Sequence, residues 1–130
     1  MVRISRSRID LESGRIDRAV VKDYGETLVG TASGTNTGSG YEVDLDDGNV
    51  FNLILTANCT FTFSNPTASG TACSFVLYLK QDGTGSRTAT WPASVVWPSA
   101  TAPTLSTTIN YTDVVSFLTV DGGTTWFGFV

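Results

Sequence analysis

Apolar and polar side chains alternate one by one along several stretches of this chain. The clearest case is residues 73–80, where one parity carries Cys73, Phe75, Leu77 and Leu79 and the other carries Ser74, Val76, Tyr78 and Lys80. Successive side chains of a strand point to opposite faces of its sheet, so a period of two predicts strands. Residues 41–46 and 59–63 alternate in the same way. We expect these strands to pack one face on a core and leave the other in water, with residues 73–80 as a central strand.

The composition fits a chain made of strands and turns. Thr and Ser together supply 33 of the 130 residues, Gly supplies 13, and only 15% of the residues are charged. Thr and aromatic residues suit a pleated surface, whereas good helix formers are scarce after about residue 30. Nine strands are expected, over residues 41–46, 50–56, 59–63, 73–80, 87–91, 94–97, 104–110, 113–120 and 124–130. This pattern predicts an all-β fold, a β-sandwich or jelly-roll-like domain with an extended N-terminal arm.

Positive charge is concentrated at the start of the chain. Six of the eight basic residues lie in the first 22 positions against three acids, giving +3, and the remaining residues carry two basic residues against nine carboxylates, giving −7. Residues 30–40, GTASGTNTGSG, are small or polar and predict a flexible joint. We therefore divide the chain into a basic arm over residues 1–29, this Gly/Ser/Thr-rich joint, and a β-sandwich domain over residues 41–130.

The arm is the part of the chain that we expect to bind a partner. Its apolar side chains show no clean period and cannot form a core, so it is either a disordered tail or a segment that becomes ordered on an acidic partner surface. Nucleic acid is a weaker interpretation, because the interleaved acids would repel phosphates. The candidate contact residues are Arg3, Ile4, Arg6, Arg8, Ile9, Leu11, Arg15, Ile16, Arg18, Val20 and Lys22.

The residue types needed for catalysis are scarce. The chain has no histidine, which removes the usual general base and the usual metal ligand. The acidic run at residues 44–47 lacks the spacing of an EF-hand calcium loop. Asp82, Asp113 and Asp121 each lie beside a turn, so solvated turn residues are favoured over the paired acids of a glycosidase. We expect a protein that is not an enzyme and that uses no cofactor or metal.

Cysteines and tryptophans are more easily explained by packing than by chemistry. Cys59 and Cys73 occupy alternating positions of apolar strands, which favours two buried free thiols over a disulfide. Trp91, Trp97 and Trp126 could stack on sugar rings, but filling the core of a small sandwich is the favoured interpretation. No run of roughly 20 apolar residues indicates a membrane span or a leader, so we expect a soluble, unprocessed chain with no membrane partner.

Residues 24–130 resemble a β-rich module that recurs in virion proteins of tailed bacteriophages. The resemblance is carried by YGETL near Tyr24, by GNVFNLILT, FSNP, KQDGTGSRT, TWPASVVW and TAPTL, and by the ending DGGTTWFGF. It implies a structural part of the phage particle, since the module occurs in tail fibre and tail tip proteins and in small proteins that decorate heads.

Chain length favours the head among these locations, because a fibre subunit usually carries a long repetitive shaft. We therefore expect a capsid decoration, or cement, protein that binds the major capsid protein of the same virion and stabilises the head shell. The alternative is a tail fibre or tail tip module that recognises a host surface glycan. The resemblance also implies a homotrimer, which would cover exposed strand edges and the apolar C-terminus, in a virion assembled in the bacterial host cytoplasm.

Overall fold

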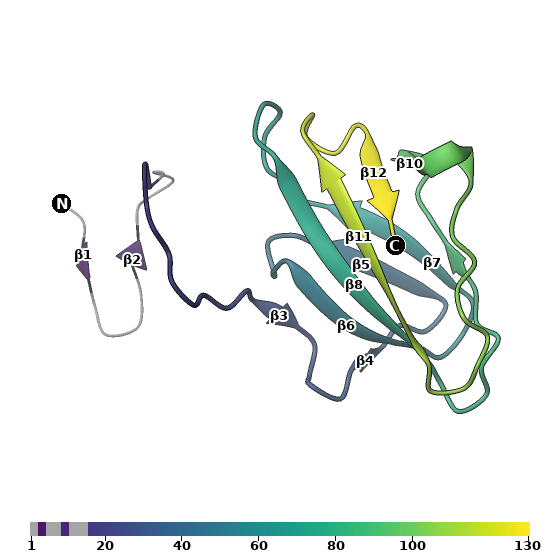
Figure 1. Ribbon diagram of the computed structural model, residues 1–130. Helices are drawn as coiled ribbons and strands as arrows, with labels where there is room; N and C mark the ends of the chain where they lie inside the picture. The colour runs from purple at the N-terminus through teal and green to yellow at the C-terminus, as the bar shows by residue number, and fades with distance from the viewer. Residues whose placement is uncertain (1–2, 5–8, 11–15) are drawn as a thin grey trace.

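The body of the protein is a sandwich of two β-sheets, as expected for an all-β chain (Figure 1). The computed structural model describes residues 3–4, 9–10 and 16–130. The seven-stranded sheet has the order β10 (Val95–Val96), β12 (Trp126–Phe129), β11 (Thr112–Thr119), β8 (Cys73–Gln81), β6 (Val50–Leu55) and β3 (Leu28–Val29), with β4 (Thr35–Asn36) also pairing with β6. The three-stranded sheet has the order β5 (Gly40–Asp44), β7 (Cys59–Ser64) and β9 (Ala89–Thr90). A separate pair is formed by β1 (Arg3–Ile4) and β2 (Ile9–Asp10).

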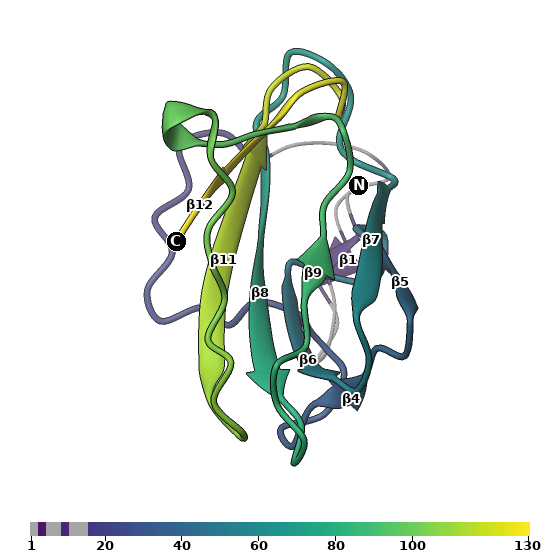
Figure 2. The same cartoon turned by 90° about the vertical axis from the view of Figure 1, so that its right-hand side faces the viewer.

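From β5 to β9, successive strands alternate between the two sheets, so this part of the chain forms a flattened coil around the core. Strands β5, β7 and β9 belong to one sheet and the intervening β6 and β8 to the other, so β5, β7 and β9 run parallel to one another and β6 runs parallel to β8. Within the sandwich, antiparallel ladders join β11 to β8 and to β12; the separate β1–β2 pair is also antiparallel. A jelly roll is built from antiparallel Greek keys, so the sandwich is the one of the two expected architectures that the body adopts. Figure 2 shows the layers from the side, with β8 and β11 in one and β5, β7 and β9 in the other.

The core lies between the sheets and is rich in aromatic rings. The half-buried Phe63 packs against three of these rings, with ring centroids 4.9 Å from those of Phe75 and Phe117 and 5.5 Å from that of Trp126. Fully buried aliphatic side chains from β5, β6, β8 and β11 complete it: Val43, Leu53, Leu55, Leu77, Leu79 and Val115. The alternation in residues 73–80 therefore has the predicted meaning, since Cys73, Phe75, Leu77 and Leu79 are all buried and β8 is central, between β6 and β11.

One expected strand is wrong and two are much shorter than expected. Residues 104–110 form no strand, because polar contacts outside a ladder hold this segment: Ser106 N–H donates to Asp113 Oδ2 (2.8 Å) and Ser86 N–H donates to the Thr107 carbonyl (3.0 Å). The segments 87–91 and 94–97 each contribute only a two-residue strand. Next to these, Pro98–Ala100 forms a single 3-10 turn, and no helix in the described residues is long and apolar enough to cross a membrane.

Residues 28–40 contribute to the larger sheet in a way that the sequence did not indicate. Leu28–Val29 and Thr35–Asn36 both pair in parallel with β6, and the Thr37 side chain is buried. Gly34 has a φ of +94° and lies against Ile54, where a Cβ would come within 2.8 Å of the Ile54 side chain, so this crossing needs glycine. The division at residues 29 and 40 stays a prediction, with the addition that the end of the arm (β3) and the joint itself (β4) both pair with β6, whereas β5 pairs with β7 in the other sheet.

Candidate binding surfaces

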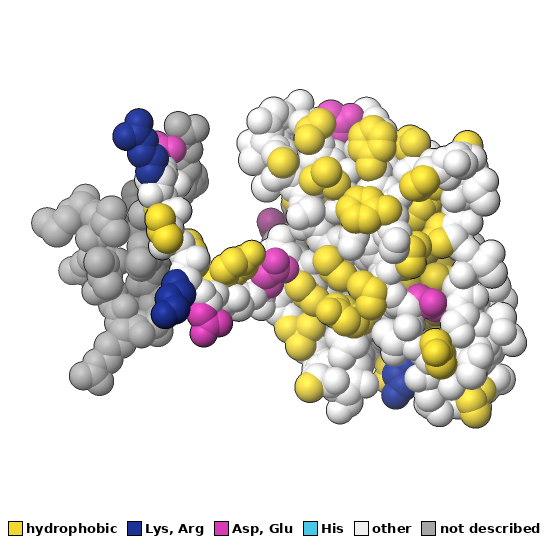
Figure 3. Space-filling model, viewed as in Figure 1, with side chains coloured by type: hydrophobic (Ala, Val, Ile, Leu, Met, Phe, Trp, Pro, Cys, Tyr) yellow, Lys and Arg dark blue, Asp and Glu magenta, His cyan; other side chains and the backbone are white. Residues whose placement is uncertain are grey.

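The outer face of the seven-stranded sheet is apolar, although it is not covered by another part of the described chain. We call it the apolar face and define it by side chains that are 36–49% exposed: Leu28, Tyr78, Val96, Val114, Leu118, Phe127 and Phe129. Figure 3 shows apolar side chains gathered over β8, β11 and β12 on this side of the body. Isolated exposed apolar residues are ordinary, but a contiguous set marks an interaction surface.

Strand register brings these residues together in rows across the sheet. In one row Leu118 lies between Ser74 and Phe127, and Phe127 is followed by Val96. The next row runs from Leu28 through Val50, Val76 and Ser116 to Phe129. A third row places Tyr78 between Asn52 and Val114. No charged residue occurs in these three rows; Lys80 is the first along β8, one row beyond Tyr78.

A shallow hollow deepens the apolar face where β3 meets β6 and β8. It has a volume of about 300 Å³ and is lined by Leu28, Ala32, Val50, Asn52 and Tyr78. Asn52 Nδ2 donates to the carbonyls of Thr31 (2.9 Å) and Ala32 (3.1 Å), so the amide group holds the preceding loop in place. The rest of the lining is apolar apart from the Tyr78 hydroxyl, and the amide donors of Asn52 are already engaged, so the hollow suits an apolar group better than a sugar.

The outer face of the three-stranded sheet is polar. Its central strand β7 presents Thr60 and Thr62, and the neighbouring β5 presents Glu42 opposite Thr62. Asp44, at the end of β5, accepts hydrogen bonds from Asn65 Nδ2 (2.8 Å) and from its own turn, and these lower its pKa. Within the described residues, no three acidic, cysteine or histidine side chains come together in a way that could hold a metal ion.

A pair of polar loops forms one end of the body. Residues 82–86 and 107–111, which we call the distal loops, converge at the lower right of Figure 1, away from the arm. They are joined by hydrogen bonds from Ser86 N–H to the Thr107 carbonyl (3.0 Å) and from Asn110 N–H to the Asp82 carbonyl (3.3 Å). Gly85, with a φ of +72°, lets them approach, because a Cβ there would meet the Thr107 carbonyl oxygen at 2.6 Å. Tyr111 projects from this end and is 61% exposed.

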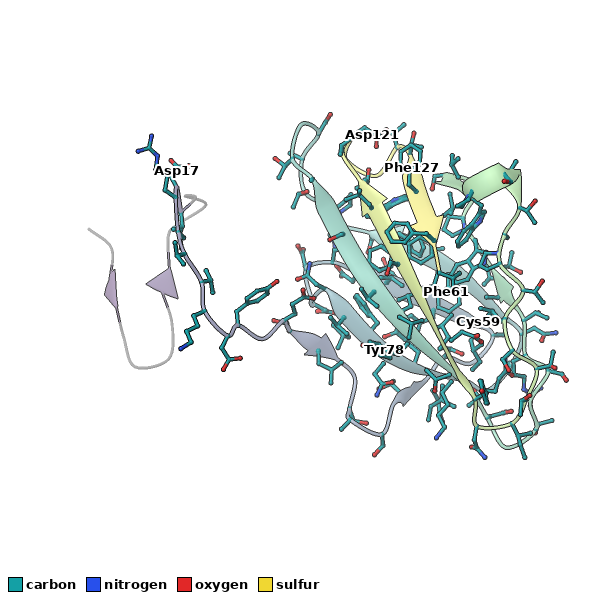
Figure 4. The ribbon with its side chains drawn as sticks, in the orientation of Figure 1. Asp17, Cys59, Phe61, Tyr78, Asp121 and Phe127 are labelled. Carbon is teal, nitrogen blue, oxygen red and sulfur yellow. The ribbon has the colours of Figure 1, made fainter. Side chains whose placement is uncertain are left out.

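Aspartate carboxylates hold the backbone of two turns, one in the distal loops and one between β11 and β12. Asp82 accepts hydrogen bonds from Arg87 Nη2 and from the Thr84 and Gly85 N–H groups, each 2.9 Å long; the Arg87 interaction is the main cause of the lowered Asp82 pKa. Asp121, in the turn between β11 and β12, accepts from the Thr125 N–H (2.9 Å) and the Thr119 hydroxyl (2.8 Å), which lower the Asp121 pKa (Figure 4). The turn interpretation of Asp82 and Asp121 is thereby confirmed.

The thiols and the tryptophans occupy the places that packing predicts. Cys59 and Cys73 are both buried and free, and burial raises the pKa of the Cys59 thiol. Figure 4 shows Cys59 within the sandwich, close to Phe61. Trp126 is 2% exposed, and the half-buried Trp91 and Trp97 pack on the core, with Trp91 stacked 5.2 Å from Phe61. These rings are engaged with one another and with phenylalanines, which confirms the core interpretation.

The arm residues proposed from the sequence divide into three groups. Arg3, Ile4 and Ile9 lie in the β1 and β2 backbone, and Ile4 pairs with Ile9. Arg6, Arg8, Leu11 and Arg15 lie outside the described residues. Ile16, Arg18, Val20 and Lys22 are exposed, Val20 at 98%, on a segment that leads away from β3 and from the sheets. Their role as contact residues stays a prediction.

Sequence reasoning overlooked the apolar face, although a signal for it was present. Val76 and Tyr78 stand on the outward parity of residues 73–80, and Val114 and Leu118 stand on the outward parity of β11. Apolar residues on both parities of a central strand indicate that both faces of its sheet are covered. The apolar ending WFGFV, for which the sequence already predicted a cover, carries the same signal, since Trp126 faces the core while Phe127 and Phe129 face outward.

Comparison with known proteins identifies the module. No curated protein and no solved structure matches the chain. One family model, described as "Putative phage tail fibre C-terminal domain", matches residues 31–125. This range begins just before β4 and ends just before β12, so it includes all the strands from β5 to β9, which alternate between the two sheets. The expected resemblance to phage virion proteins is confirmed, and the protein is a structural component of a phage virion. The chain belongs to the phage tail fibre C-terminal domain family.

Proposed function

We propose that this protein is the receptor-binding module of a phage tail fibre or tail tip and that it recognises a glycan on the host surface. The observation that carries the proposal is the family match over residues 31–125, which is to a tail fibre domain. That match favours the tail over the capsid decoration expected from chain length. Recognition of this kind needs a rigid scaffold with exposed loops and no catalytic step, and we propose that the protein is not an enzyme.

The distal loops are the surface that best suits a sugar. They combine the flat, exposed ring of Tyr111 with hydroxyl and amide groups from Thr84, Ser86, Thr108 and Asn110. An aromatic face packs on the C–H groups of a sugar ring, while hydroxyl and amide groups exchange hydrogen bonds with its hydroxyls. The hydrogen bonds between the two loops hold them in a fixed arrangement, which limits the entropy lost on binding.

A glycan array and an adsorption assay test this proposal together. The purified protein should give discrete glycan hits and should block adsorption of the phage to host cells. Tyr111→Ala should weaken both by about tenfold or more, since truncating an aromatic hot spot of a binding site costs about 2 kcal/mol or more. Tyr24→Ala is the matched control, because Tyr24 is 70% exposed but lies on the segment leading to the arm; it should change neither. Adsorption blocked equally by both variants would reject the distal loops as the glycan site.

Copy number separates the tail from the head. A tail appendage is present in a few tens of copies or fewer, whereas a decoration protein that binds the major capsid protein is present in hundreds. Quantifying the protein against the major capsid protein in purified virions would measure this directly. A count in the hundreds would overturn the proposed location and support decoration.

We assign attachment to the arm and self-association to the body. The arm carries a net +3 over residues 1–22 and exposes Ile16 and Val20, which suits docking on an acidic part of the tail. Deleting residues 1–22 leaves β3 intact and should give a folded protein that is absent from purified particles. Retained incorporation would reject the arm as the anchor. The body is proposed to form a homotrimer, assembled with the virion in the host cytoplasm, without nucleic acid or membrane partners.

A further inference from the structure

The apolar face needs a cover, and its size is that of an interface. Its three aromatic side chains can each bury about 150–250 Å² and its Leu and Val side chains somewhat less, so the exposed fractions of 36–49% amount to roughly 600 Å² on one copy. Two such faces together would bury about 1,200 Å², which is the lower limit of a standard specific interface. The half-buried Val50 and Val76 in the same rows would add to this area.

Charge indicates which partner can use this face. Residues 23–130 carry a net charge of −7, so two bodies repel each other through most of their surfaces. The carboxylates of the sandwich lie outside the three rows, on β5, in turns and loops or at the start of β11: Glu42, Asp44, Asp46, Asp47, Asp82, Asp113 and Asp121. A partner of opposite charge would gain nothing from an uncharged face, whereas a second acidic copy loses least by approaching there.

We infer that the apolar face is the interface between copies of this chain. This inference deepens the proposed self-association by naming its surface, and it does not depend on the distal loops or on a glycan. The rows of β12, β11 and β8 pack on the same rows of a neighbouring copy, with Tyr78, Phe127 and Phe129 as the largest side chains. Contact between like rows is two-fold symmetric, so this face joins two copies and would give a dimer in place of the proposed homotrimer. The distal loops lie at the end of the body and remain open to solvent in such an assembly.

Sedimentation velocity on the full-length protein tests the inference. The wild-type protein should sediment as an oligomer, and Phe127→Asp should raise its dissociation constant by about 100-fold or more, because a charge would be buried without a partner. Thr62→Asp is the matched control, since it adds the same charge to the polar outer face; it should leave the oligomer unchanged. A monomeric wild-type protein, or an oligomer insensitive to Phe127→Asp, would overturn the inference.

Thiol labelling tests independently whether the apolar face is covered in the oligomer, and it does not require a variant that breaks the interface. Ser116 lies in the middle row between Val76 and Phe129, whereas Thr62 lies on the opposite outer face. A maleimide should react with Ser116→Cys at least about tenfold more slowly at concentrations where the protein is associated than after dilution to monomers, whereas its rate with Thr62→Cys should not depend on concentration. A Ser116→Cys rate that does not rise on dilution would place the interface elsewhere. Protection that persists in the monomer would mean that the chain's own arm covers the face.

Binding and association can fail separately in these experiments. Loss of glycan binding in an intact oligomer would reject the proposed receptor site alone. A monomer that still blocks phage adsorption would reject the apolar face as an interface alone.

Discussion

The two outer faces of the sandwich share one core yet differ in what they can contact. The seven-stranded sheet presents Tyr78, Leu118 and Phe127 to the outside, and the three-stranded sheet presents Thr62 and Glu42. Both sheets commit their other face to the same buried rings. A strand with apolar side chains on one side only is typical of a sheet with one buried face, while a strand with apolar side chains on both sides is typical of a sheet whose two faces are both covered. The polar outer face of the three-stranded sheet is therefore stable in contact with water, whereas the apolar face of the seven-stranded sheet is suited to contact with another protein surface.

The largest effect should come from the core that both faces depend on. Phe75 is 1% exposed and contacts the rings of Phe63, Phe117 and Trp126. Phe75→Ala should lower the free energy of unfolding by about 3–5 kcal/mol, through lost burial and the cavity that remains. Thr62→Ala, on the polar face, should change it by less than about 0.5 kcal/mol. Urea unfolding of both variants measures this, and a similar loss in the two would contradict the described core.

The next effect concerns the link between the two sheets. Gln81, at the buried end of β8, accepts a hydrogen bond from the Arg87 N–H (2.8 Å) and donates one to the Arg87 carbonyl (2.9 Å), just before β9. Gln81→Leu keeps the volume but leaves both backbone groups without a partner, so unfolding should become easier by roughly 3 kcal/mol.

A similar hydrogen bond from a side-chain amide to the backbone, but exposed to water, provides the control for Gln81. Asn58 Oδ1 accepts from the Thr88 N–H (3.1 Å) near the surface, where water can replace it. Asn58→Ala should cost only about 0.5–1.5 kcal/mol. Equal losses in the two variants, measured by urea unfolding, would show that the Gln81 contact does not join the sheets as described.

A smaller effect is expected at the strand that carries the exposed phenylalanines. Gly128 faces inward between Phe127 and Phe129, and a Cβ there would come within 2.5 Å of the Trp97 ring. Gly128→Ala should displace β12 or Trp97 and cost about 1–3 kcal/mol. Gly83→Ala, where no atom lies within 4 Å of the new Cβ, should be close to neutral. Thermal unfolding at a fixed protein concentration compares the two, and an equally neutral Gly128→Ala would show that β12 is loosely held.

The smallest effect expected is the pH dependence of stability. It should come from the carboxylates in the turns and not from the apolar face, whose three rows carry no charge. The pKa values of Asp82 and Asp121 lie below the ordinary 3.8 in the folded state. Their contribution to stability is therefore complete above that value and is lost as the pH falls through the lower folded values. Melting temperature recorded against pH should decline in this acidic range, and Asp121→Asn should decline less steeply. A decline that is identical in the variant would remove Asp121 as a cause.

The candidate sites could be predicted only in part, for reasons that particular residues make plain. The burial of Trp126 and of the two thiols followed from alternation and from residue type. The distal loops could not be assembled in advance, because residues 82–86 and 107–111 are far apart in the chain and residues 104–110 have a strand-like composition. Their conformation depends on the hydrogen bond from Ser86 N–H to the Thr107 carbonyl across the loops, and on the bond from Ser106 N–H to Asp113 beside them. The exposed arm residues were identifiable by charge, but no partner is present to show their contacts.

Local pattern by itself determined that this chain forms strands, which residues of each strand share a side, and that Phe75 and Leu77 face the core. It did so because the two-residue period is a property of the extended backbone. Only the tertiary structure decided that β5, β7 and β9 run parallel in one sheet while β6 and β8 run parallel in the other. It also decided that Leu118 and Phe127 lie side by side and share one face of the sheet with Tyr78. Strand pairing joins segments distant in sequence, and register depends on the whole core rather than on any single strand.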